Sequence, residues 1–218
     1  MQRIITCLVL SAVLALGAAC SETPTSVPAP TTQPTVVVET ETVAVATAAT
    51  TETNAPQQVA WTSDGVVSAG EYASEATIGS VKLWWRHDGE QLYMAMQADT
   101  KGWVSVGFMP EQRMQGADYV LGFVQDGEVQ VHDAWGDAPV GSHPNDEELG
   151  GANDLVAFGG AESDDGTTIE FQRPLAPTDE YDKVLEPGAR VALLVATGAS
   201  DGSSTPHNYR GSGNITLE

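Results

Sequence analysis

Cysteine is nearly absent from this chain, and its two cysteines, Cys7 and Cys20, both lie near the start. From residue 21 onward the sequence therefore allows no disulfide, no zinc–thiolate site and no cysteine nucleophile. The Cys-x-x-Cys-His signature of covalent haem attachment is missing as well. Any haem in this protein would have to be held non-covalently.

Positive charge is also scarce, since 9 Lys and Arg stand against 30 Asp and Glu and give a formal net charge of -21. Such a surface repels nucleic acid and anionic lipid headgroups, so nucleic acid is excluded as a partner. The acidity favours either solubility alone or docking to a partner with a basic face. The sequence contains no P-loop, no Gly-rich dinucleotide turn and no Ser-His-Asp constellation, so we expect a module that is not an enzyme by itself.

The first residues predict export. Arg3 precedes an almost unbroken apolar run, Ile4 to Leu16, which is shorter than the roughly 20 residues that span a bilayer. This layout is typical of a signal peptide, here residues 1–19. The ending Leu16-Gly-Ala-Ala-Cys20 resembles the bacterial lipobox, with the leucine one position further from the cysteine than usual. The resemblance implies a lipoprotein anchored through Cys20 on the extracytoplasmic side, at the cell surface or in the periplasm. An uncleaved anchor and ordinary cleavage after Ala19 are the alternatives.

A composition change divides the rest of the chain into a linker and a domain. Residues 20–57 are dominated by Thr, Pro, Val and Ala and contain no aromatic residue. A segment of this kind cannot bury enough apolar surface to offset the entropy of ordering, so we expect a disordered, extended tether. Val36 to Val38 could form a short strand, but we interpret them as linker. Residues 58–218 are predicted to form the folded domain.

Alternating apolar and polar residues recur throughout this domain, with Gly, Asp, Asn or Pro between the runs. Such a pattern predicts an all-β fold, an antiparallel, immunoglobulin-like sandwich. Strands are expected at residues 81–86, 92–97, 102–108, 119–124, 129–134, 168–172, 191–196 and 214–217. The polar, Gly-rich stretch 143–160 is expected to be a long loop.

Several segments, in this order, resemble the DOMON domain. They are Asp64–Tyr72, Gly102–Phe108, Met114–Asp118, His132-Asp133, Thr168–Leu175 and His207–Gly211. The resemblance extends over nearly all of Trp61 to Glu218. It implies a ligand-binding sandwich, with haem-binding and sugar-binding versions.

The cytochrome version of this domain, as in cellobiose dehydrogenase, binds b-type haem between one Met and one His. Carried onto this sequence, the resemblance implies that Met114 and His207 are the two ligands of the haem iron. Such a pair suits electron transfer, because thioether sulfur favours ferrous iron and both axial positions are filled. Trp103, Phe108 and Tyr119 are the candidate walls of the cofactor-binding slot, with Met109 beside them.

Other interpretations of the same residues remain open. Met114 could be a methionine that fills an irregular gap, and His207 could be an exposed loop histidine. Met109 is a competing sulfur ligand, and His87 and His132 are alternative nitrogen donors.

Carboxylates are numerous enough to suggest a glycosidase pair or a Ca²⁺ site, the candidates being Asp118, Asp133, Glu170, Asp179 and Asp182. We interpret Asp64, Asp118 and Asp133 more simply, as turn caps and surface charges. Glu170 and Arg173 are expected to make cross-strand contacts or salt bridges. The acidic run after His143 could bind a metal weakly, but a solvated loop is favoured.

The sequence thus predicts a membrane-tethered b-type haem domain that exchanges electrons with an extracytoplasmic redox protein. The alternative is a haem-free sandwich that binds carbohydrate or a protein partner at the cell surface. In that case Trp84, Trp103 and Trp135 would serve as exposed stacking platforms.

Overall fold

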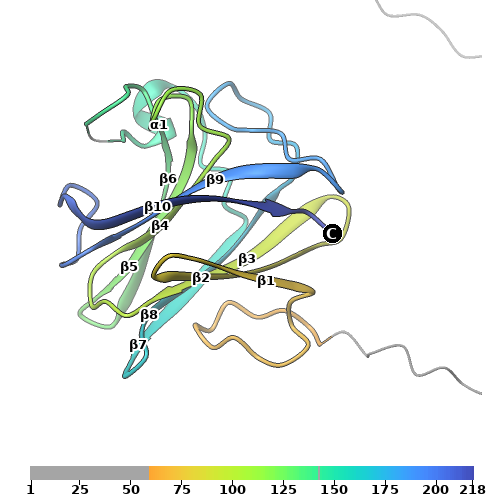
Figure 1. The fold of residues 1–218 in the computed structure, drawn as a ribbon, viewed down its shortest axis with the longest axis vertical. Helices are drawn as coiled ribbons and strands as arrows, with labels where there is room; N and C mark the ends of the chain where they lie inside the picture. The colour runs from red at the N-terminus through yellow and green to blue at the C-terminus, as the bar shows by residue number, and fades with distance from the viewer. Residues whose placement is uncertain (1–58, 142) are drawn as a thin grey trace, which may run out of the picture. The chain divides into compact units, whose positions relative to one another are not determined.

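The computed structural model of the protein describes residues 59–141 and 143–218. These residues form two five-stranded sheets that pack face to face (Figure 1). The order in the first sheet is β1 (Ser74–Ile78), β2 (Val81–His87), β3 (Gln91–Ala98), β8 (Gly166–Pro174) and β7 (Ala157–Ser163). In the second it is β10 (His207–Thr216), β9 (Arg190–Gly198), β4 (Val104–Phe108), β5 (Asp118–Gln125) and β6 (Glu128–Trp135). Neighbouring strands are antiparallel. The predicted all-β sandwich is therefore confirmed.

The core lies between the sheets and follows the period of two. Successive side chains of a strand point to opposite faces. On β4 this places Val104, Val106 and Phe108 inside, each with 0% exposure. On β2 it places Val81, Leu83 and Trp85 in the same core. Burial of each such side chain contributes about 1.5–3 kcal/mol, which makes this core the main source of stability.

Two strands lie where none was expected. The segment predicted to be a loop over residues 143–160 contains a short helix, α1 (Asp146–Leu149), and the start of β7. The sequence of β7 does not alternate between apolar and polar residues, because two of its positions are glycines that lie against the backbone of other segments. A Cβ at Gly159 would overlap the carbonyl of Ser63, where the chain before β1 crosses the strand. β1 was also missed, and β10 begins at His207 instead of near Asn214.

The chain before β1 is fastened to the first sheet through the buried carboxylate of Glu170, and the carboxylate of Glu71 stabilises the turns within that segment. Glu170 accepts hydrogen bonds from the backbone of Gly65 and the hydroxyl of Tyr72, both at 2.7 Å. Glu71 accepts from the backbone of Thr62 and Ser68 at 2.9 Å each. Glu170 was expected to make a cross-strand contact or a salt bridge; its contacts are instead with the segment before β1.

Several predictions fall on residues outside the described ranges. They are the signal peptide at residues 1–19, the lipid on Cys20, and the linker with Val36 to Val38. Within the described part of the chain, no helix is both long and apolar enough to cross a membrane.

Candidate functional site

The outer face of the second sheet is unusually apolar. Phe108 points inward, so the same alternation points Trp103, just before β4, to the outer face of the sheet. On β5 the alternation points Tyr119 and Leu121 outward. These three outward side chains are only 5%, 6% and 8% exposed. The outer face of an antiparallel sheet is commonly polar and solvated. Here it forms two further apolar clusters, with Ala196 beside Trp103 and Met114 and Leu194 beside Tyr119.

A cavity of about 320 Å³ lies on this outer face. That volume is at the lower end of the range found for small-molecule sites, about 300–1,000 Å³. Its apolar wall includes Trp103, Tyr119, Leu121 and Leu194. Both Met114 and His207, which are 93 positions apart (207 − 114), also line it. The structure therefore brings together the two residues that the resemblance had singled out.

Met114 reaches the cavity from the loop between β4 and β5. Arg113, just before it, adopts a positive φ of 58°, which turns the chain back on itself. Gly116 donates a backbone hydrogen bond to Gly136 (2.8 Å), and Gly136 donates one to Ala117 (2.8 Å). A Cβ at Gly136 would overlap the carbonyl oxygen of Met114. The position of Met114 therefore depends on a glycine in a different loop.

The two large rings in the wall also depend on glycines. A Cβ at Gly107 would overlap the ring of Tyr119, and one at Gly198 would overlap the indole of Trp103. These glycines let each ring lie flat against a neighbouring strand. The indole nitrogen of Trp103 then donates to the Thr205 hydroxyl at 2.8 Å. Trp103 thereby holds the loop that leads directly to His207.

A third donor at the cavity, His143, was not predicted as a ligand of this site. Its ring stacks on Tyr119 with 4.2 Å between centroids and 17° between planes. Its Nδ1 and the Tyr119 hydroxyl are both buried without a hydrogen-bond partner. Burial lowers the pKa of His143, and the neighbouring charge of His207 lowers it further against the opposing effect of Asp137. His143 is therefore held in the neutral form that can bind a metal.

Phe108 was wrongly predicted to be a wall residue. It has 0% exposure in the core between the sheets. Its position on β4 shares the inward face of Val104 and Val106. There its ring lies 5.5 Å from the guanidinium of Arg173. Phe108 therefore supports the sandwich and does not contact the cavity.

The competing donors do not line the cavity either. Met109 is 40% exposed at a positive φ of 50°. His132 stacks on Phe123 at 5.8 Å, and His87 ends β2 in the other sheet. Met114 is the methionine that lines this cavity.

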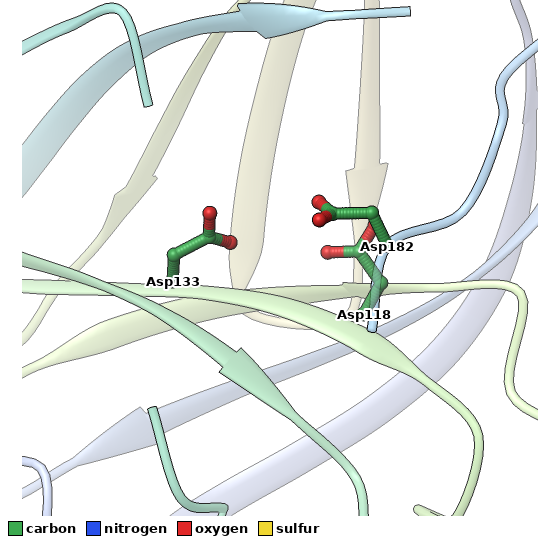
Figure 2. A group of neighbouring side chains, drawn as sticks. All are labelled: Asp118, Asp133 and Asp182. Carbon is green, nitrogen blue, oxygen red and sulfur yellow. The ribbon is translucent and has the colours of Figure 1, made fainter. Parts of the chain in front are cut away.

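A second cluster of functional groups lies at one end of the core. Asp118 and Asp133 are 0% and 3% exposed, so their interpretation as surface charges was wrong. Arg173, itself 1% exposed, donates through Nη1 to Asp118 at 2.6 Å and through Nη2 to Asp182 at 2.8 Å. Figure 2 shows the carboxylates of Asp118, Asp133 and Asp182 pointing toward one another. We call these three residues the acidic cluster.

Burial changes the protonation of these acids. It raises the pKa of Asp133 to about 6, although Arg173 pulls it down. It raises the pKa of Asp146, on α1, to about 8, and nearby carboxylates add to the effect. Burial also raises the pKa of Asp182, against the lowering effect of Arg173. One guanidinium therefore does not compensate all of these buried charges.

Known proteins resemble this chain in fold and, in part, in sequence. Two solved structures each have a TM-score of 0.47 and 8% identity to it. One is the cytochrome b domain of pyranose dehydrogenase from Coprinopsis cinerea, with 62% of this chain and 76% of that chain covered. The other is the cytochrome domain of Myriococcum thermophilum cellobiose dehydrogenase, with 63% and 75% covered. A carbohydrate binding module of family 9 from Caldicellulosiruptor kristjanssonii has a TM-score of 0.38 and 12% identity, with 73% and 92% covered.

The sequence relationship is closer to an animal protein. DBH-like monooxygenase protein 1 from Mus musculus is 32% identical over 107 residues, or 49% of this chain. This chain covers 17% of the length of that protein. Residues 77–198 match the DOMON domain family, which is more than half of the chain. The protein therefore belongs to the DOMON domain family, as its sequence motifs implied.

Proposed function

We propose that this protein is an exported, membrane-tethered domain that binds b-type haem and exchanges electrons with another protein. The observation that carries the proposal is the joint presence of Met114 and His207 in the wall of one apolar cavity. Their thioether and imidazole are both known axial ligands of haem iron, and together they raise its potential relative to two imidazoles.

The remaining cavity residues fit a non-covalent porphyrin. Trp103, Tyr119 and Leu121 offer flat apolar surface and exclude water from the site. Two exposed guanidinium groups, Arg113 and Arg210, also line the cavity. On a chain with a net charge of -21, basic residues at this position are suited to the two propionates of a haem.

Haem would supply one-electron chemistry, and Met114 and His207 are the residues that would hold its iron. The His207 side chain is exposed at the start of β10. Trp103 holds the loop before it through Thr205, and Gly136 lies against the carbonyl oxygen of Met114. Such a domain transfers electrons and makes no bonds itself. The acidic surface suits a redox protein with a basic docking face.

The same proposal places the domain outside the cytoplasm on a lipid attached to Cys20. Replacement of Cys20 by Ala should move the protein from the membrane fraction into buffer. If wild type and variant partition alike, the lipid anchor is absent.

Haem titration of the purified protein tests the main proposal. We expect a low-spin, six-coordinate spectrum with sharp bands on reduction. His207→Ala should abolish or greatly weaken binding, because the stronger ligand is lost. Met114→Leu should weaken it less and lower the potential, or open a position that takes carbon monoxide. Met109→Leu is the matched control, since Met109 lies outside the cavity, and its spectrum should not change.

A broad spectrum of loosely adsorbed porphyrin in the wild type would refute haem binding. Carbohydrate or protein binding would then be the function to test. Trp103 is too buried to act as an exposed platform. Trp84, which lines an open groove with Glu75 and Gln97, would be the residue to replace in a glycan-binding assay.

A further inference from the structure

The acidic cluster contains buried carboxylate oxygens that accept no hydrogen bond from the protein. Asp118 Oδ2 accepts from Arg173 and from the backbone nitrogen of Lys183. Asp182 Oδ1 accepts from Arg173, and Asp133 Oδ2 accepts from the backbone of Asp154 at 2.8 Å. The second oxygen of each carboxylate is buried and has no partner. In each of the three side chains one oxygen is thus held by hydrogen bonds and the other is free to bind a cation.

A fourth carboxylate gives an independent indication of a missing cation. Asp146 is 1% exposed, and both of its oxygens lack a hydrogen-bond partner. One oxygen each from Asp146, Asp179 and Asp182 lie within 4.8 Å of one another. An unpaired buried carboxylate costs several kcal/mol, so native proteins pair it or coordinate it to a metal. Asp146 therefore extends the acidic cluster toward α1.

We propose that the acidic cluster, with Asp146 beside it, is a calcium-binding site. One oxygen each from Asp118, Asp133 and Asp182 lie within 4.8 Å of one another. Ca²⁺ binds oxygen at 2.3–2.6 Å, so ligands on opposite sides of the ion are separated by about 4.8 Å. Carboxylates from β5, β6 and the β8–β9 loop can therefore share one ion.

The chemistry of the donors selects calcium among common cations. All of them are hard oxygen ligands, without the His or Cys that zinc and copper prefer. Mg²⁺ keeps several of its waters and binds few protein ligands. Ca²⁺ accepts irregular geometry and 6–8 oxygen ligands. The acidic cluster supplies three buried carboxylates toward that number, and Asp146 lies beside them.

The ion would join segments that are far apart in sequence. Asp118 begins β5, Asp133 belongs to β6 and Asp182 lies between β8 and β9. Asp118 directly precedes Tyr119, and Asp146 follows His143 by three positions. Calcium would thereby fix the strand and loop ends that carry part of the cavity. This inference does not depend on haem binding.

Calorimetric titration of the full-length protein, stripped with EDTA, tests the site with Ca²⁺ alone. We expect one ion per chain and a rise in Tm of about 5–10 °C at a hundredfold excess over Kd. Asp133→Asn and Asp182→Asn keep the shape of the side chain but remove the ligand charge, and each should weaken binding at least tenfold. Both variants should remain folded, because Asp133→Asn removes a buried charge that has no salt-bridge partner and Asp182→Asn leaves Arg173 paired with Asp118.

Asp164→Asn is the matched control, since Asp164 is exposed in the turn between β7 and β8, and it should bind calcium as the wild type does. Absence of heat and of a Tm shift up to about 10 mM Ca²⁺, beyond the range of weak extracellular calcium modules, would overturn the proposal. Undiminished binding by both cluster variants would do the same, because the ion would then lie elsewhere. Equal affinity for Mg²⁺ would refute the assignment to calcium.

Discussion

Replacement of Arg173 by Met should destabilise the domain severely. Arg173 is the cation that pairs with Asp118 and Asp182 in the buried end of the core, at 2.6 and 2.8 Å. Methionine nearly preserves the volume of the side chain and leaves two carboxylates without their charge partner. Removal of one partner from a buried ion pair typically costs 3–5 kcal/mol, much more than loss of an exposed pair.

The size of this effect can be converted into a melting temperature. In a domain of 150–250 residues, each kcal/mol shifts Tm by about 2–4 °C. Arg173→Met is therefore expected to lower Tm by about 6–20 °C at pH 8 in EDTA, measured by calorimetry or circular dichroism. The loss should be smaller at pH 5, because burial raises the pKa of Asp133 to about 6, so that Asp133 is then protonated and leaves less negative charge for Arg173 to offset. Arg173→Lys should give an intermediate loss, since it keeps the charge without the two-pronged geometry.

Arg190→Met provides the control, because Arg190 is exposed at the start of β9, and its Tm should change little. An equal Tm for Arg173→Met and wild type at pH 8 would refute the reasoning. It would mean that the acids around Arg173 are already neutral in the native state and need no cation.

Two further predictions concern the cavity wall and pH. Gly107→Ala should cost about 1–3 kcal/mol, because the added Cβ displaces the Tyr119 ring; an unchanged Tm would show that the ring moves freely. In EDTA, stability should fall as pH rises, because burial raises the folded-state pKa of Asp133 to about 6 and of Asp146 to about 8, above the unfolded value of about 3.9. Their stabilising contribution is complete below pH 4 and is lost as pH rises through 6 and 8. Thermal melts across this range measure it, and a stability that instead rises from pH 5 to 9 would contradict the assigned shifts.

The sequence predicted the central strands and missed short or glycine-rich edge strands. β1 and β7 are the two edges of the first sheet, and the first half of β10 is an edge of the second. An edge strand is held largely by backbone hydrogen bonds to one neighbour, which require no particular side chain. Gly159 and Gly211 even lie where alternation would place a larger residue. Periodicity therefore had little to detect in β7 and in the first half of β10. β1 does alternate, with Ala76 and Ile78 toward the core, but it is only five residues long.

The cavity was predictable only in part. Met114 and His207 came from the resemblance to the DOMON domain, and no local pattern linked them. His143 was missed because its approach to Tyr119 depends on how a long loop folds. The error at Phe108 was avoidable, because Phe108 shares the parity of Val104 and Val106, so the strand pattern already placed it in the core.

The buried acids had a similar signal. Asp118 has the parity of Val120, and Asp133 has that of Val131, so both aspartates fall on the inward face of their strands. Aspartate is also common in turns, so the residue type alone suggested a turn at both positions. Only the tertiary structure supplies Arg173 from the other sheet, which makes their burial possible.

The first two residues of β5 place the two candidate sites on opposite faces of one sheet. Asp118 points into the core, where it is part of the acidic cluster. Tyr119 points outward, where its ring is part of the cavity wall. If calcium and haem both bind, each must change the affinity of the other by the same factor. Haem titrations with and without Ca²⁺, and calcium titrations with and without haem, measure that factor in both directions. Asp133→Asn should abolish the coupling and preserve haem binding, because Asp133 does not line the cavity, whereas His207→Ala should remove haem binding and leave calcium affinity unchanged.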